Sequence, residues 1–271
     1  MMNIFAAEGP HISIAPDTLF HIGPMPVTNS QILGIVGSLL VLWILWATAK
    51  AIKNGSRARG PHMILWFFEN LYDTTVEVIG DKHIARKVIP LAVTIVFFFV
   101  INNWLGLLPI VGSITYNDVP LLRGAAADLN MTFAVAIISI VTAQIWAAKR
   151  RGFFGNIGRY INFHSPLHFA EGILDLIAEF SRTAALSLRM FGNVFGGEVL
   201  LVVIAFLTSY AAAVALPVFY VLELFVGAVQ AYVFYMLTIA FISLGLPNPD
   251  EAHGHSAEAK TEIGAPAQEK A

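Results

Sequence analysis

Charged side chains inside the long apolar stretches are the residues of this chain best suited to chemistry. The stretch 167–208 contains Glu171, Asp175, Glu179, Arg182, Arg189 and Glu198, and the stretch 212–246 contains Glu223. A charge at the centre of a bilayer costs about 2.5–3.5 kcal/mol even by the lowest estimates, so such side chains usually face protein or water and mark an ion path. Carboxylates in this setting are suited to proton transfer.

The charged residues of 167–208 fall on two sides of the expected helix. At about 100° per residue, six residues lie within roughly 40° of one line, namely Glu171, Asp175, Arg182, Arg189, Asn193 and Gly196. Glu198 follows Arg189 by nine residues and lies near the opposite side, so we expect the two to serve different surfaces. Gly192 and Gly196 form a GxxxG pair with Gly197 beside it, which allows another helix to approach closely.

The last apolar stretch carries a second acid that is suited to proton transfer. Glu223 and Gln230 are seven residues apart, which places them on one helix face. If 167–208 and 212–246 fold back on each other, Glu198 and Glu223 come to a similar depth near the outer side. An acid on each of two adjacent helices predicts a water-filled mouth for protons.

The composition indicates a membrane protein and excludes several other classes. Hydrophobic residues make up 57% of the 271 residues and charged residues only 13%, whereas soluble domains carry about 25% charged residues. The absence of cysteine excludes disulfides, iron–sulfur clusters and thiolate chemistry. The sequence has no phosphate-binding glycine loop, so we do not expect this chain to hydrolyse a nucleotide or to be an enzyme on its own. We interpret His253 and His255, in a polar tail, as unbound, and predict no metal or cofactor.

Five stretches are long and apolar enough to cross a bilayer, which takes roughly 20 residues. They cover about 31–49, 88–110, 130–148, 167–208 and 212–246. As a helix, 167–208 would be roughly 63 Å long, about twice a bilayer, so we expect it to be strongly tilted or broken. In 61–80, acids at four-residue spacing lie beside apolar residues, which predicts an amphipathic helix at the membrane interface. The predicted fold class is an all-α integral membrane protein whose last two helices form a long tilted hairpin.

The two ends of the chain differ from the membrane domain, which we place at 31–246. Residues 1–30 contain four prolines and no Lys or Arg, so they lack the basic flank of a signal peptide and are expected to be extramembrane. Residues 247–271 are polar, and we predict a disordered cytoplasmic tail.

The distribution of Lys and Arg between the spans predicts the orientation. The segment 50–87 has seven of them, 149–159 has four, and 111–129 has only Arg123. Short cytoplasmic loops hold the excess of basic residues. We therefore expect the amino terminus outside and the carboxyl terminus in the cytoplasm.

Several motifs closely match one known family. SLRMFGNVFGGE at 187–198 and ELFVGAVQAYVFYMLT at 223–238 resemble subunit a of the F-type ATP synthase membrane sector. INNWLGLLP at 101–109 and DLNMT at 128–132 extend the resemblance. The order of spans matches across most of 31–246.

The resemblance implies a function for the last two helices and their polar residues. Residues 167–246 would lie tilted against a rotating ring of c subunits, and Arg189 would be the essential arginine of the family. The polar positions that the family uses on the outer proton path correspond to Asn193, Glu198, Gln230 and Glu223. At the last of these, some members have histidine and others an acid.

The implied mechanism is electrostatic gating by Arg189. A protonated ring carboxylate is neutral and can face lipid, but its charged form is favoured beside an arginine, so its proton is released inward. After rotation the carboxylate is protonated again from the outer path, and Arg189 stops a direct leak. The inner path would pass Asp175, roughly 21 Å from Arg189, with Glu171 and Glu179 near its cytoplasmic mouth.

The resemblance also implies partners and a location. The expected partners are the c-subunit ring, b-type peripheral stalk subunits, other ATP synthase subunits and the lipid bilayer, with no nucleic acid. The expected location is an energy-transducing membrane, namely a bacterial plasma (inner) membrane.

Other interpretations of these residues stay open at this point. The chain would be an autonomous ion channel or secondary transporter if it held an internal repeat or a substrate cavity, and the sequence has no such repeat. A non-conducting scaffold would leave the buried charges unexplained. Glu198 and Glu223 would have a purely structural role if they made hydrogen bonds to Tyr or Ser. Asp175 would have no part in the inner path if it were a solvated acid or a partner of Arg182. Glu171 and Glu179 would then be surface acids.

Overall fold

The computed structural model describes residues 13–23, 25–55, 58–108, 111, 115–116, 119–151, 166–208 and 212–246. Its helices are α1 (Asn29–Lys53), α2 (Arg59–Ile79), α3 (Lys82–Gly106), the 3-10 helix η1 (Ala125–Ala127), α4 (Leu129–Arg151), α6 (Pro166–Thr208) and α7 (Ala212–Gly245). Its strands are β1 (Thr18–Ile22), β2 (Met25–Thr28), β3 (Thr115–Tyr116) and β4 (Val119–Pro120). The predicted tail 247–271 lies outside the described residues.

Five of the described helices are long and apolar enough to cross a membrane: α1, α3, α4, α6 and α7. They match the five predicted spans in number and order, and they confirm the all-α membrane fold class. The largest difference is at α3, which begins at Lys82 and not near residue 88. Asp81 caps this helix by accepting hydrogen bonds from the backbone N–H groups of His83 and Ile84, so helical structure extends into the polar approach to the membrane.

The amphipathic helix predicted at 61–80 is α2, which ends at Gly80 with a left-handed φ of 74°. Its acids Glu69, Asp73 and Glu77 are exposed, as the amphipathic pattern predicts. Its apolar side packs against α3 and α7, where the Tyr235 hydroxyl donates a hydrogen bond of 2.6 Å to a backbone carbonyl of α2. The location of α2 at the membrane interface stays a prediction.

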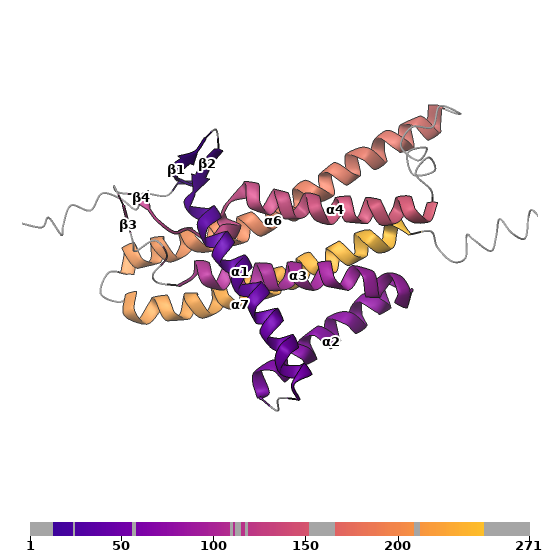
Figure 1. Cartoon of the computed structure of the whole chain (residues 1–271). Coiled ribbons are helices and arrows are strands. Elements are labelled where there is room, and N and C mark those ends of the chain that lie inside the picture. The colour runs from indigo at the N-terminus through magenta and orange to yellow at the C-terminus, as the bar shows by residue number, and fades with distance from the viewer. Residues whose placement is uncertain are drawn as a thin grey trace, which may run out of the picture.

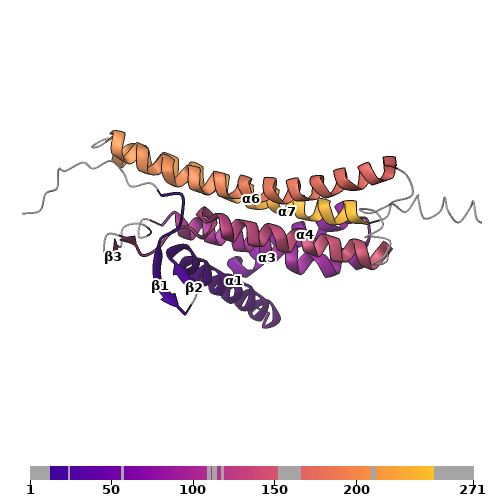
Figure 2. The same cartoon turned by 90° about the horizontal axis from the view of Figure 1, so that it is seen from above.

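The helices form layers, with the α6–α7 hairpin as one face of the molecule (Figure 1, Figure 2). α3 and α4 pack beneath this hairpin, and α1 lies on the far side of α3. The core between the layers is apolar, and Phe99 of α3 lies 4.7 Å from Phe234 of α7 between ring centroids. Leu186 and Met190 of α6 are buried in the same cluster. This core fixes one side of α6 and leaves the other side outermost.

Two short antiparallel hairpins lie outside the spans, and the sequence patterns did not predict them. β1 pairs with β2 directly before α1, and β3 pairs with β4 between α3 and α4. Asn29, the first residue of α1, ties the two regions together, because its side-chain amide donates to the Pro120 carbonyl at 3.0 Å. The segment before the first span is therefore ordered from Ser13 to Thr28 within the described residues.

Candidate functional site

Arg189 lies on an exposed side of α6, near the middle of this 43-residue helix. Its side chain is exposed, and it has no hydrogen-bond or ion-pair partner among the described residues. A Cβ added to Gly192 or to Gly196 would meet nothing within 4 Å. The arginine therefore lies on an open helix side, and no described helix of this chain packs against the GxxxG pair.

Glu198 and Glu223 meet on the opposite side of α6, in a small cavity between α3, α6 and α7. The cavity is lined by Asn103, Gly106, Leu107, Val194, Glu198, Glu223 and Gly227. The space that the centre of a water molecule can occupy inside the cavity is about 10 Å³, which is roughly the space that one water needs. The hairpin thus brings the two predicted acids to the wall of one cavity, which has room for about one water.

Glycines allow these two carboxylates to lie so close to neighbouring backbone. A Cβ added to Gly197 would overlap the Glu223 carboxylate, and one added to Gly124 would lie 2.7 Å from an oxygen of Glu198. A larger residue at either position would displace a carboxylate.

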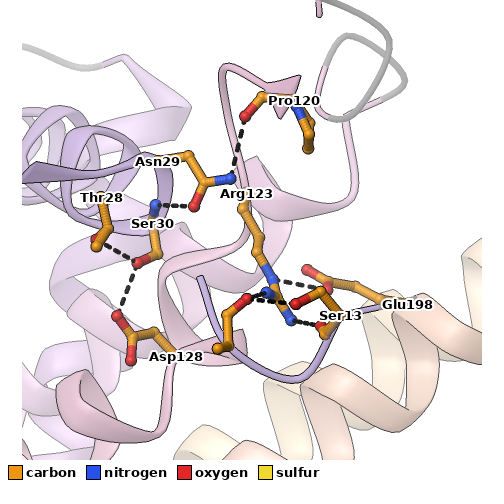
Figure 3. A network of polar contacts seen from close by, with 9 residues as sticks. Ser13, Thr28, Asn29, Ser30, Pro120, Arg123, Asp128 and Glu198 are labelled. Carbon is orange, nitrogen blue, oxygen red and sulfur yellow. Dashed lines mark hydrogen bonds and ion pairs between the residues drawn. The ribbon is translucent and has the colours of Figure 1, made fainter. Parts of the chain in front are cut away.

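Arg123, from the loop before α4, lies beside Glu198, which lines the cavity (Figure 3). Its Nε lies 3.7 Å from Glu198 Oε2, and its side chain is only 10% exposed. Its two terminal nitrogens donate hydrogen bonds of 2.8 Å to the backbone carbonyls of Ala15 and Ser13. One buried guanidinium thus holds a membrane carboxylate and the segment that precedes β1.

Three amide side chains near this region each keep one buried polar atom without a hydrogen-bond partner. The Asn193 Nδ2, Gln230 Nε2 and Asn103 Oδ1 atoms have no hydrogen-bond partner among the described residues. Buried polar atoms are normally satisfied by protein or water. Donors and acceptors left open in this way are suited to hold water, and Asn103 lines the cavity itself.

The predicted inner residues are separate from this outer group. Arg182 pairs with Glu179 at 3.4 Å, so the carboxylate placed beside this arginine is Glu179. Asp175 is half-buried and has an interaction partner of its own. Glu171 belongs to α6, but its side chain lies outside the described ones.

Sequence reasoning did not select Arg123 or Asn103 as site residues. Arg123 was visible only as the single basic residue of 111–129, a segment otherwise without Lys or Arg. Asn103 lies in the INNWLGLLP motif at 101–109, and its position on the cavity wall follows from how α3 packs on α7. Arg123 could have been selected as a lone basic residue beside an apolar span, and Asn103 as a polar residue within one.

We expect Gly197→Ala to impair proton transfer more than folding. The new methyl group would displace the Glu223 carboxylate, which sits at the end of a flexible side chain, and overpacking of this kind costs about 1–3 kcal/mol. ATP-driven proton pumping in membrane vesicles, normalised to the amount of this subunit in the membrane, measures the effect. The control is Gly60→Ala on α2, because a Cβ there meets nothing. Equal pumping by the two variants would contradict the expectation.

Comparison with known proteins places the whole membrane domain in one family. The family model described as ATP synthase A chain matches residues 31–243. ATP synthase subunit a of Mycobacterium bovis is 33% identical over 242 residues, covering 84% of this chain and 91% of the relative. That of Desulforamulus reducens is 32% identical over 235 residues, covering 84% and 83%. The chain therefore belongs to the ATP synthase A chain family and is a multi-pass subunit of the membrane sector of an ATP synthase.

Proposed function

We propose that this subunit provides two proton half-channels to a rotating ring of c subunits, and that Arg189 separates them. The observation that carries the proposal is the exposure of Arg189 without an ion-pair partner. It is exposed on the outermost side of an apolar span and has no counter-ion among the described residues of its own chain. Such a charge is costly in a membrane unless a partner arrives from elsewhere.

A carboxylate on another chain is the partner that this arginine fits. Arginine stays charged in apolar surroundings and binds carboxylates with a planar fork of donors. The open glycines Gly192 and Gly196 lie one and two helical turns further along and allow a second helix to approach the α6 backbone. The ends of α6 curve away from the rest of the molecule, so its outer side is concave (Figure 2). A concave surface suits the convex wall of a ring.

The outer half-channel would use the cavity of Glu198 and Glu223. Two acids and one water-sized space make a short relay in which a proton can move between carboxylates. The unpaired amides of Asn193 and Gln230 would hold water between this cavity and the side of α6 that carries Arg189. The proton would reach the ring carboxylate along this line.

The inner half-channel would run along the other half of α6. Asp175, Glu179 and Glu171 precede Arg189 on this helix, and the first two are half-buried. A ring carboxylate that meets Arg189 would lose its proton to this side, because the nearby positive charge favours the ionised form. Rotation would then bring the emptied carboxylate to the outer half-channel, while Arg189 repels protons that would otherwise cross directly.

The proposal includes an orientation and an assembly. The loop that holds Arg123 and the end of α6 would face outside, and the basic ends of α1 and α4 would face the cytoplasm. The membrane would be a bacterial inner membrane. The partners would be the c ring and b-type peripheral stalk subunits.

We expect Gly196→Leu to weaken binding of the c ring without unfolding this chain. The isolated chain has open space at this position, whereas a docked ring helix would be overpacked by about 1–3 kcal/mol, or roughly tenfold in affinity. Co-purification of c subunits with a tagged copy of this chain from detergent extracts measures the loss. Gly60→Leu on α2 is the control.

Two results would overturn the proposal. One is full recovery of c subunits with Gly196→Leu. The other is proton conduction by the purified wild-type chain alone in liposomes, which would favour an autonomous channel.

A further inference from the structure

The side chain of Arg123 is buried, although the residue lies in a loop between α3 and α4. The residue is 9% exposed, and its guanidinium also lies 5.8 Å from the Phe195 ring. A buried arginine is retained only where its hydrogen bonds are satisfied, since removing a charge from water is costly. The hydrogen-bond and ion-pair partners of Arg123 therefore show which parts of the chain its guanidinium connects.

Those partners come from two distant parts of the chain. On one side is the Glu198 carboxylate of α6, at 3.7 Å from Nε. On the other side are the carbonyls of Ser13 and Ala15, each at 2.8 Å from a terminal nitrogen (Figure 3). The planar donor fork of arginine can serve three such acceptors at once, whereas an ammonium group cannot match the same geometry. The guanidinium joins the amino-terminal segment to the cavity.

The amino-terminal segment is held at its other end by the same loop region. The Asn29 backbone N–H donates to the Asp17 carbonyl at 3.1 Å, and its side chain donates to Pro120 at 3.0 Å. The next residue, Ser30, donates to a carboxylate oxygen of Asp128 at 2.7 Å. Residues 13–30 are thus bound against 119–128 at both ends.

We propose that residues 13–17 form a fixed cap over the outer cavity, and that Arg123 positions both this cap and the Glu198 carboxylate for proton uptake. The inference rests on the proposed function. The charged groups that face Glu198 within the described part of the chain are Arg123 from the loop and Glu223 from α7. The cap keeps the guanidinium directed at Glu198, so that one carboxylate of the cavity is oriented and the other remains free to exchange its proton.

The test uses the whole ATP synthase complex in proteoliposomes, with ATP synthesis driven by a proton gradient imposed from the outer side. Four variants are compared: Arg123→Gln, Arg123→Lys, a chain shortened to begin at Pro16 after an initiating methionine, and the shortened chain with Arg123→Gln. Assembly is checked in each by the recovery of c subunits and by the rate of ATP hydrolysis in detergent.

We expect Arg123→Gln to lower the rate of ATP synthesis roughly tenfold, which is within the loss of about 100-fold that a 1 Å misplacement of a reacting group can cause. We expect the shortened chain to lower this rate less. Arg123→Lys should match the shortened chain, because the ammonium keeps the charge at Glu198 but loses the carbonyl contacts. The combined variant should be no slower than Arg123→Gln alone, since both changes remove one connected set of contacts.

A wild-type rate in the shortened chain, or losses that multiply in the combined variant, would overturn the cap. If the complex with Arg123→Gln fails to assemble, the rates of ATP synthesis of Arg123→Lys and of the shortened chain are compared instead. Both should be lowered to the same extent. A wild-type rate for Glu198→Gln combined with Glu223→Gln in the same assay would overturn the outer half-channel itself, so failure of the cap and failure of the proposed function give different results.

Discussion

Replacing Arg189 with alanine is expected to abolish ATP-driven proton pumping while leaving the subunit in the membrane. The side chain makes no hydrogen bond or ion pair within the described part of the chain, so its loss removes no internal contact of that kind. The loss would fall instead on the ring carboxylate, which would no longer be held ionised. Removal of one preorganised electrostatic group costs roughly 100- to 1,000-fold in rate. Acidification of inverted vesicles on addition of ATP is the measurement.

Two further variants make this result specific. Arg189→Lys is expected to restore little, because a lysine in apolar surroundings can lose its proton and lacks the planar fork. Arg59→Ala changes an exposed arginine at the start of α2 and should pump at the wild-type rate. Coupled pumping retained in Arg189→Ala would remove the residue from the mechanism.

The apolar patterns predicted the long helices closely, because length and hydrophobicity are properties of each segment alone. The two largest, predicted at 167–208 and 212–246, are α6 and α7 at 166–208 and 212–245. The start of α3 was missed because a cap at Asp81 begins that helix in polar sequence. A hydrophobicity pattern carries no information about a capping hydrogen bond of this kind.

Helical periodicity also gave the placement of Arg189 and Glu198 on opposite sides of α6, since angle follows from residue number. It did not predict the contact between Arg123 and Glu198. These residues are far apart in the sequence. They meet where the backbone at Gly124 approaches the backbone at Gly106 so closely that a Cβ added to Gly106 would lie 3.1 Å from the Cα of Gly124. Contacts made by loops depend on packing of the whole chain, and no local pattern specifies them.

Combining Glu198→Gln with Glu223→Gln is expected to slow proton uptake from the outer side far more than either change alone. Both carboxylates line one cavity, so a proton can still bind there while one acid remains, whereas two amides cannot carry it. General acid–base groups contribute about 100- to 10,000-fold. We expect roughly tenfold for each single variant and at least about 100-fold for the pair. ATP synthesis driven by an imposed gradient reports the uptake step.

The two single variants should differ in severity, and this difference tests the cavity further. Glu198→Gln replaces the carboxylate beside Arg123 with a neutral amide, so it removes a proton site and also the ion pair to the guanidinium. Glu223 has no hydrogen bond within the described residues, so Glu223→Gln removes only a proton site and should be the milder change. The matched control is Glu69→Gln with Glu77→Gln on the exposed side of α2, which changes the same charge outside the cavity. If the cavity double variant synthesised ATP as fast as this control, neither acid would belong to the proton path.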